Sequence, residues 1–193
     1  VADVLADHAD RLADLADRFM LAKADMAPRT VDTYRQTIKL HIKPKIGAWA
    51  VSEATTARLD RFLQGVVTEH GPGAAKACKS VLSGMLGLAA RSDAIRTNPM
   101  REVSPIQKHT KGAVAIPLDQ LPTLLAKVRA DQRLLELDMV DLIEFLAATG
   151  ARIGEACALA WVDVDLEAGT AHIHANLVRA HGLGIIRQDH PKT

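Results

Sequence analysis

The sequence of 193 residues predicts a mainly α fold, in which a helical domain precedes an α+β domain with a small antiparallel β-hairpin. Three observations support this fold class. Aromatic residues make up 3% of the chain against 48% apolar residues, and the helix former alanine is abundant. Up to about residue 148, apolar residues recur at helical spacings. From about residue 170 they alternate with polar residues, as in half-buried strands.

The first predicted helix covers residues 2–26, because Leu5, Leu12 and Phe19 repeat every seven residues. Another face of this helix carries an acidic stripe with spacings of four and three. The stripe consists of Asp3, Asp7, Asp10, Asp14 and Asp17. Phosphate groups repel such a stripe, so we expect it to face water or another subunit.

The second predicted helix covers residues 30–43 and ends at Pro44 and Gly47. It carries a basic ridge whose members recur mainly every four residues. The ridge and the preceding arginine comprise Arg29, Arg35, Lys39 and Lys43. Cations in a row on one helix face are suited to contact DNA phosphates.

The third and fourth predicted helices cover residues 55–70 and 73–92, with Gly71 as the stop between them. Outside its apolar stripe, the fourth helix presents short and basic side chains that suit entry into a major groove. These side chains are Lys76, Lys79, Ser80, Ser83 and Arg91. The sequence Arg-Thr-Asn-Pro-Met then ends the helix.

Residues 104–116 lack periodicity and contain proline and glycine, which predicts a linker that Lys108 and Lys111 make basic. The domains are therefore expected at residues 1–103 and 117–193. The second domain begins with two helices and a short third helix from Arg152, and it continues with two strands joined by a glycine-containing turn. The ranges are about 118–130, 134–148 and 152–159 for the helices, and 170–178 and 184–190 for the strands.

Charge is unevenly distributed along the chain. Residues 28–115 hold 14 basic and 6 acidic side chains, a net charge of +8, whereas residues 1–27 carry −3 and residues 116–193 carry −4. A basic middle segment favours a polyanionic partner such as nucleic acid, although a solvated basic surface is a common alternative.

The cysteines and the apolar stretches indicate the cellular compartment in which the protein is expected. Cys78 and Cys157 lie in helical patterns and are predicted to be reduced, not disulfide-bonded. No stretch is typical of a membrane span or a signal peptide, so we expect a cytoplasmic protein.

Arg152 and Glu155 are the strongest candidates for chemistry. They are three residues apart and therefore share one helix face. Arg152 also lies near a helix N-terminus, where backbone N–H groups attract anions. By spacing alone a structural ion pair is the more common interpretation. The alternative is that Arg152 binds a phosphate and Glu155 holds the guanidinium in place.

The segment ATGARIGEACALAWVDVDLEAGTAHI resembles the first active-site segment of tyrosine recombinases of the phage integrase family. The residues that carry this resemblance are Thr149, Gly150, Arg152, Glu155, Leu159, Trp161, Asp163, Val164 and Asp165. The closing Pro-Lys-Thr, which contains Lys192, is similar to the family's lysine motif. PRTVDTYRQTIKLHIKPKIG and RTNP look like parts of its helical core-binding domain.

This resemblance implies a core-type DNA-binding domain followed by the first part of a catalytic domain, which would be incomplete. It also implies a reaction in which a tyrosine attacks DNA and forms a phosphotyrosyl intermediate. Arg152 would stabilise the charge on phosphorus, and Lys192 would protonate the leaving oxygen. No metal or nucleotide cofactor is implied. The implied partners are a double-stranded DNA core site and further copies of the protein in a tetrameric synapse.

The family's His-x-x-Arg motif and nucleophilic tyrosine come after the lysine, and only Thr193 follows Lys192. Tyr34, the single tyrosine, lies on a core-facing stripe. We therefore expect the 193 residues to bind DNA without cleaving it. The alternative is a non-enzymatic DNA-binding or regulatory protein with an integrase-like frame. A weaker one is a helical interaction module based on the acidic stripe.

Four histidines gather near the C-terminus. His172 and His174 are predicted to share a strand face, with His181 and His190 nearby in sequence. No cysteine or carboxylate stands at ligand spacing to complete a metal site. We therefore expect exposed histidines and no metal.

Overall fold

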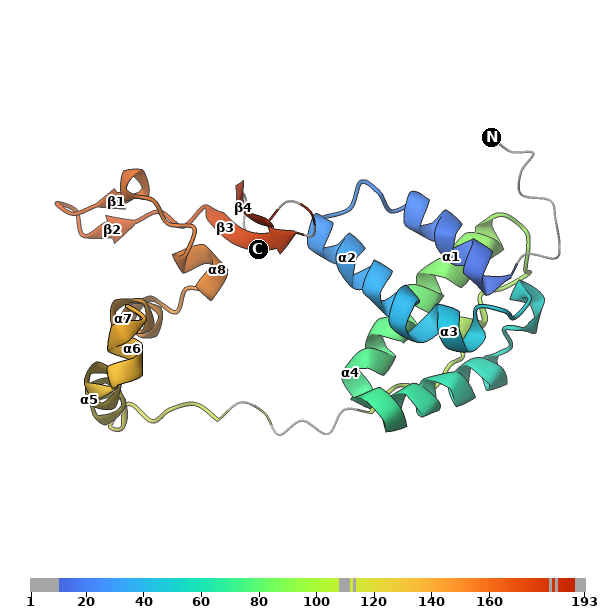
Figure 1. The fold of residues 1–193 in the computed structure, drawn as a ribbon, viewed down its shortest axis with the longest axis horizontal. Coiled ribbons are helices and arrows are strands. Elements are labelled where there is room, and N and C mark those ends of the chain that lie inside the picture. The colour runs from blue at the N-terminus through green and yellow to red at the C-terminus, as the bar shows by residue number, and fades with distance from the viewer. Residues whose placement is uncertain (1–10, 108–111, 113, 181, 183, 190–193) are drawn as a thin grey trace. The chain divides into compact units, whose positions relative to one another are not determined.

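The computed structural model describes residues 11–107, 112, 114–180, 182 and 184–189. The chain divides into two compact units, Val1–Thr110 and Lys111–Thr193. The division falls within the segment that the sequence predicts to be a linker. Figure 1 shows the helices of the first unit and the mixed elements of the second. The predicted fold class is confirmed, since a helical unit precedes an α+β unit with a small antiparallel hairpin.

The first unit consists of helices around one apolar core (Figure 1). Its elements in chain order are α1 (Leu12–Leu21), α2 (Pro28–Thr37), the π-helical turn η2 (Ile38–Ile42), α3 (Lys43–Ile46), the 3₁₀ turn η3 (Val51–Glu53), α4 (Thr56–Arg91) and the 3₁₀ turn η4 (Pro99–Arg101). Leu59, Leu63 and Met85 are fully buried, at positions that the sequence predicts to face inward. Burial of each such side chain stabilises the unit by roughly 1.5–3 kcal/mol.

Helix α1 ends earlier than the periodicity predicts. It runs from Leu12 to Leu21, and the part of the predicted helix before residue 11 lies outside the described residues. After Leu21 the backbone N–H groups of Lys23, Ala24 and Met26 donate to carbonyls three residues back. These turn-type bonds replace the four-residue spacing of an α-helix and close the chain into a turn before Pro28.

The second predicted helix extends past Pro44, where the sequence predicts its end. Helix α2 continues through η2 into α3 and finishes at Ile46. Proline lacks an N–H group and clashes with the carbonyl four residues back, which normally stops an α-helix. The wider π-helical turn before Pro44 spaces its bonds five residues apart, so the helix continues past the proline.

Gly71 divides α4 into the two helices that the sequence predicts. Its φ of +81° and ψ of 170° are non-helical, and Pro72 follows at the start of the second half. A positive φ of this size is easily adopted by glycine alone among the standard residues. The predicted stop at Gly71 is thus confirmed, because the chain bends sharply there between the two helices that make up α4.

The second unit contains short helices and two small sheets. The helices and turns are α5 (Leu121–Ala130), α6 (Gln132–Glu136), α7 (Val140–Thr149), α8 (Ile153–Ala156) and the 3₁₀ turn η5 (Trp161–Asp163). The strands are β1 (Val164–Asp165), β2 (Thr170–Ala171), β3 (Ala175–Ala180) and β4 (Gly184–Asp189), paired antiparallel as β1 with β2 and β3 with β4.

Two elements of this unit that the sequence predicts to be continuous are each divided in two in the structure. The helix predicted over 134–148 is interrupted, because Asp138 has a left-handed backbone with a φ of 54° between α6 and α7. The strand predicted over 170–178 is split into β2 and β3. β2 pairs with β1 and β3 pairs with β4, and the bond from the His172 N–H to the Asp163 carbonyl at 2.8 Å continues the first pairing past β2.

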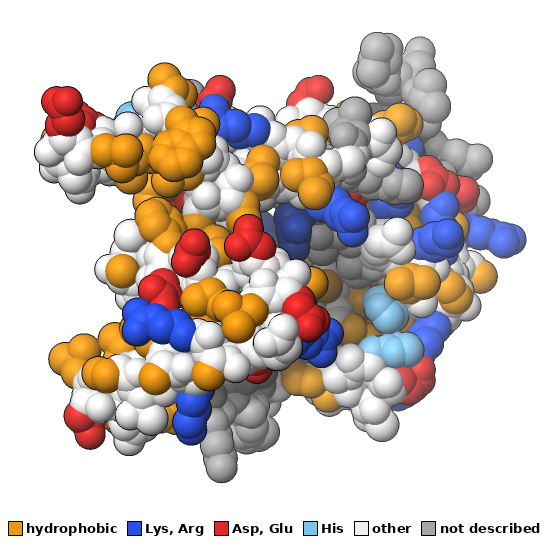
Figure 2. All heavy atoms as spheres, turned by 60° about the vertical axis from the view of Figure 1, so that its left-hand side comes forward, with side chains coloured by type: hydrophobic (Ala, Val, Ile, Leu, Met, Phe, Trp, Pro, Cys, Tyr) orange, Lys and Arg blue, Asp and Glu red, His pale blue; other side chains and the backbone are white. Residues whose placement is uncertain are grey.

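Few residues of the second unit are buried. Among those described, only Ala158 and Ala175 fall in the buried class. Trp161 and Val162 are 84% and 91% exposed, and Figure 2 shows hydrophobic side chains at the surface of this unit. A groove of about 480 Å³ runs beside Trp161, lined by Leu142, Phe145 and Leu159 among others. Within the described part of the chain, no helix has the length and apolar character that a membrane span requires.

Candidate functional site

Arg152 lies in a short extended segment between α7 and α8. Gly150 ends α7 with a φ of +68°, a left-handed conformation that glycine adopts at helix ends. The Thr149 hydroxyl donates to the Phe145 carbonyl at 2.7 Å and accepts from the Ala151 N–H at 3.2 Å. The Thr-Gly pair therefore fixes the exit of the chain from α7 and sets where Arg152 enters α8.

Glu155 holds Arg152 from the first turn of α8. Its carboxylate accepts from the Arg152 backbone N–H at 2.9 Å and from the guanidinium Nη1 at 2.8 Å. The backbone hydrogen bond, and then the bond from the guanidinium, lower the pKa of Glu155 below its ordinary value of 4.5. Glu155 therefore stays ionised over the physiological pH range and keeps the arginine oriented.

The two side chains differ in exposure, and this difference bears on their chemistry. The Glu155 side chain is 11% exposed, whereas the Arg152 side chain is 75% exposed. The ion pair favoured by the spacing is present. It nevertheless leaves most of the guanidinium open to solvent, where its remaining N–H groups can meet two oxygens of an arriving phosphate.

Helix α8 is packed closely against strand β3. A Cβ atom at Gly154 would lie 2.3 Å from Oδ1 of Asn176 and 3.0 Å from the Leu177 carbonyl. A side chain at this position would require the Asn176 amide to move away and the Leu177 backbone to shift by a few tenths of an ångström. The glycine between Arg152 and Glu155 in the motif therefore allows the helix that carries them to lie directly on the hairpin.

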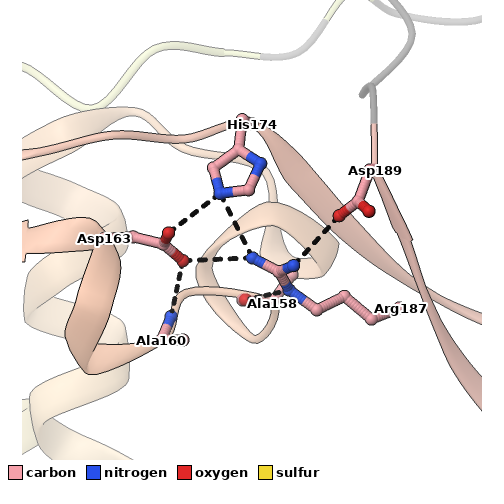
Figure 3. Close-up of polar contacts among 6 residues, drawn as sticks. All are labelled: Ala158, Ala160, Asp163, His174, Arg187 and Asp189. Atoms are coloured by element: carbon pink, nitrogen blue, oxygen red, sulfur yellow. Dashed lines mark hydrogen bonds and ion pairs between the residues drawn. The ribbon is translucent and has the colours of Figure 1, made fainter.

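A second polar cluster lies where α8, η5 and the β3–β4 hairpin meet (Figure 3). We call Asp163, His174 and Arg187 the corner network. Asp163 accepts from His174 Nε2 at 2.8 Å and from Arg187 Nη2 at 3.1 Å. The hydrogen bond from His174 is the largest cause that lowers the pKa of Asp163 from its ordinary 3.8.

This cluster corrects the expectation for His174, whereas His172 is exposed as the sequence predicts. The rings of His172 and His174 do lie together, with centroids 5.0 Å apart. His174, however, is half-buried and bonded to Asp163, so it is not a freely exposed hairpin residue. Asp163 belongs to the motif that carries the family resemblance, but the sequence predicted no role for it. Arg187 carried no local signal, because its partner is 24 positions away in the chain. His181 and His190 lie outside the described residues.

The predicted basic ridge has two environments. Arg29 and Lys39 are exposed, and Arg35 is exposed while pairing with Asp32 at 2.7 Å. Lys43 instead contacts α1, where its Nζ donates to both carboxylate oxygens of Asp17 at 2.7 and 2.8 Å. The member of the acidic stripe nearest the ridge thus pairs with it inside the first unit.

The fourth predicted helix corresponds to the second half of α4. Lys76, Ser80 and Ser83 are exposed and share one helix face at spacings of four and three. Lys79 is partly buried, and its Nζ donates to the Val103 and Ser104 carbonyls at 2.8 and 2.9 Å. That lysine joins α4 to the chain that leaves the first unit. Lys108, Lys111 and Lys192 lie outside the described residues.

Comparison with known proteins supplies the family. No protein-family model matches the chain. The chain is 31% identical to tyrosine recombinase XerC of Xylella fastidiosa (strain 9a5c) in an alignment of 177 residues that covers 84% of this chain. It spans 56% of that relative.

Solved structures share the fold. The Tn1549 transposon integrase in complex with circular intermediate DNA has a TM-score of 0.82 at 19% identity, covering 93% of this chain and 59% of that one. The lambda integrase tetramer bound to a Holliday junction has a TM-score of 0.67 at 21% identity, covering 96% and 52%. These structures share the fold, and the Arg152 motif together with the XerC relative gives the assignment: the chain belongs to the tyrosine recombinase, or phage integrase, family.

Proposed function

We propose that this chain supplies DNA binding and phosphate positioning to a site-specific recombinase that cuts and rejoins DNA through a phosphotyrosyl intermediate. Residues 1–103 act as the core-type DNA-binding domain, and residues 117–193 supply the first part of the catalytic domain. The arrangement of Arg152 and Glu155 carries the proposal. A largely buried carboxylate orients a largely exposed guanidinium within the family's motif.

The chemistry follows from charge. When a tyrosine attacks a DNA phosphodiester, negative charge grows on the oxygens of the five-coordinate phosphorus. Arg152 stabilises this charge through its paired N–H groups. Lys192 protonates the leaving 5′ oxygen. The covalent link to tyrosine conserves the energy of the broken bond, so the reaction needs neither a metal nor a nucleotide cofactor.

The described side chains also support binding without cleavage by the 193 residues themselves. The single tyrosine, Tyr34, is stacked on Phe19 with ring centroids 5.7 Å apart and packs against the core of the first unit. A ring held in this way is a packing residue and not a nucleophile. The neighbouring structures named above contain DNA, one of them as a tetramer, which supports double-stranded DNA and further copies as partners.

Salt dependence tests the DNA-binding part of the proposal. Binding of a fluorescent duplex, measured by anisotropy, is expected to weaken with salt with a slope of about −0.9 for each phosphate contacted. Lys39→Ala and Lys76→Ala are each expected to reduce that slope by about 1. Lys127→Ala, an exposed lysine on α5, is the matched control and should leave the slope unchanged.

Binding that does not respond to salt, or no binding at all, would contradict this assignment. An equal loss in Lys127→Ala and Lys76→Ala would instead place the DNA interface elsewhere on the chain. The experiment uses the chain alone, so it does not depend on the proposed catalytic roles.

The catalytic role of Arg152 is tested in a longer chain that adds the second arginine and the nucleophilic tyrosine of the family. Arg152→Ala is expected to lower the rate of phosphotyrosyl formation about 10²- to 10³-fold, with little change in DNA affinity. The measurement is single-turnover trapping of the protein–DNA adduct on a nicked substrate. Near-normal trapping by Arg152→Ala would remove this residue from the reaction.

The alternative function is that of a DNA-binding regulator, and it is consistent with the packing of Tyr34 against Phe19. A DNA-binding regulator with an integrase-like frame would bind a duplex with the same salt dependence. Its longer form, however, would yield no adduct with any nicked substrate. The adduct assay therefore separates the two functions.

A further inference from the structure

The corner network joins three parts of the second unit through one arginine. Arg187 lies in β4 opposite Leu177 of β3. Its Nε donates to the Ala158 carbonyl at 3.1 Å, just after α8, and its Nη1 contacts Asp189 at 2.9 Å. Its Nη2 reaches Asp163 of η5 at 3.1 Å. All three guanidinium nitrogens therefore have partners, as Figure 3 shows.

The Asp163 carboxylate is the fixed centre of this arrangement. Its side chain is 10% exposed. Oδ2 accepts from the Ala160 N–H at 3.1 Å as well as from Arg187, and Oδ1 contacts His174. A buried carboxylate with several donors is held firmly, and removal of one charged partner leaves it poorly compensated.

The contacts of His174 define which ring nitrogen carries a proton. Its Nε2 lies 2.8 Å from Asp163 and 3.3 Å from Arg187 Nη2. An arginine can only donate and an ionised carboxylate can only accept, so Nε2 serves one of them. The shorter distance assigns the Nε2 proton to the bond with Asp163. His174, next to β3, and Arg187, in β4, thus each bring one donor to the same carboxylate.

The network is connected along the chain to both residues that are proposed to act on the leaving group and the phosphate. Ala158 follows the helix that Arg152 begins, and Lys192 comes three residues after Asp189, the last residue of β4. Three residues span at most about 10 Å of chain. The orientation of the hairpin therefore limits where the lysine can reach.

We propose that Asp163, His174 and Arg187 are positioning residues that fix the β3–β4 hairpin against the end of α8, so that Lys192 reaches the leaving oxygen of the phosphate bound by Arg152. This inference rests on the function proposed above. Arg187 acts through the hairpin and does not touch DNA. Lysine cannot replace it fully, because the single ammonium nitrogen cannot reach partners that arginine contacts from three separate nitrogens of its planar guanidinium.

Hydrogen exchange of the 193-residue chain tests the structural half. Arg187→Ala is expected to speed exchange of the β3 and β4 amides by about 10- to 100-fold, as for the loss of charge-assisted hydrogen bonds. In Arg187→Lys, the exchange rates of these amides should lie between those of the unaltered chain and those of Arg187→Ala. Arg179→Ala removes an exposed arginine from β3 of the same hairpin and should change nothing. Amides of α5 and α7, in the same unit but outside the network, report whether each variant is folded.

The functional half is tested in the longer chain with the second arginine and tyrosine. Arg187→Ala is expected to slow cleavage at saturating DNA while affinity stays within about twofold, and Arg187→Lys should recover part of the rate. A DNA substrate with sulfur as the 5′ leaving atom should remove the defect. Thiols are far stronger acids than alcohols, so that leaving group needs no proton from Lys192. The same substrate should not rescue Arg152→Ala.

The outcomes separate this inference from the proposed function. If the unaltered chain does not bind DNA, the proposed function fails whatever the exchange data show. If it binds DNA but Arg187→Ala leaves hairpin exchange unchanged, the network does not hold the hairpin. If exchange rises but the sulfur substrate gives no rescue, Arg187 is structural only and the link to Lys192 is wrong.

Discussion

The same hydrogen-bond arrangement of a carboxylate occurs at two positions in the second unit. Glu155 accepts from the N–H of Arg152, and Asp163 accepts from the N–H of Ala160, each three residues back at the start of a helical turn. Each carboxylate also binds an arginine that is more exposed than itself. A short carboxylate fixed by backbone therefore orients a long cation, which reduces the entropy that the cation loses when a ligand arrives.

The pH response of Glu155 follows from its lowered pKa. A carboxylate whose pKa falls on folding contributes stability above its unfolded pKa, near 4.5, and loses it as pH falls through the lower folded value. The hold on Arg152 should therefore persist at pH 5 and be lost only as the pH falls below the ordinary pKa of 4.5. Carbon-13 NMR of the Glu155 carboxyl measures this titration.

Glu155→Gln is the control for that titration, since it removes the ionisable group and keeps a similar shape. A Glu155 carboxyl that titrates at or above 4.5 would contradict the arrangement, because the two hydrogen bonds from Arg152 require the ionised form.

The two cysteines are expected to differ sharply in reactivity. Cys78 is fully buried, and burial raises the pKa of its thiol to about 11, whereas Cys157 is exposed. Since the thiolate is the reactive form, a thiol reagent at pH 8 should modify Cys157 rapidly and Cys78 only after unfolding. Mass spectrometry of the labelled native chain checks this, with Cys157→Ser expected to abolish the fast phase.

Residue-scale features were accessible to sequence reasoning only where partners are close in the chain. The spacing of Arg152 and Glu155 made their ion pair predictable. The partnership of Lys79 with Val103 and Ser104, and that of Arg187 with Asp163, depend on how distant segments pack. No local pattern specifies such contacts.

Elements of the first unit depend on two glycines of α4 in opposite ways. A Cβ at Gly84 would lie 2.7 Å from the ring of Phe19, which is 2% exposed and stacked on Tyr34. A Cβ at Gly65 meets nothing within 4 Å. One glycine therefore makes room for the packing of α1 on α4, and the other only lowers helix propensity.

Alanine at these two positions gives a matched pair of variants. Gly84→Ala is expected to destabilise the chain by about 1–3 kcal/mol through overpacking. Gly65→Ala should stabilise it by about 0.5–1 kcal/mol through helix propensity. Urea unfolding followed by circular dichroism measures both. Equal effects of the two substitutions would show that α1 does not pack on α4 as described.

Element types were largely predictable, and their limits were not. Apolar periodicity located the helices of the first unit because each buries one face. The π-helical turn before Pro44 and the left-handed backbone of Asp138 were missed. Both are uncommon backbone conformations that the residue types at these positions do not favour. The split between β2 and β3 was missed because the two parts pair with different strands, β1 and β4, and the alternating pattern does not specify strand partners.

At the scale of the whole molecule, the two units differ in how much they bury. The first has a continuous apolar core, and the described part of the second has two buried alanines beside exposed Trp161 and Val162. Small units that bury little apolar surface are marginally stable. The basic charge of residues 28–115 and the motif around Arg152 were both visible in sequence, whereas this imbalance required side-chain exposures.

Limited proteolysis should reveal the imbalance. At low protease concentration, the second unit is expected to be cut first, leaving a fragment that contains α1 through η4. Mass spectrometry over time identifies the products. Simultaneous loss of both units would show that the second is as stable as the first.

The placement of the two tryptophans has an optical consequence. Trp49 lies in the first unit, half-buried with the Arg58 guanidinium 4.1 Å from its ring centroid, and Trp161 lies exposed in the second. Each unit therefore carries a fluorophore of its own, in contrasting surroundings. Trp161 should already emit like indole in water, whereas the emission of Trp49 should shift to the red only when the first unit unfolds. With Trp161→Phe, the colour of the remaining emission would report on the first unit alone.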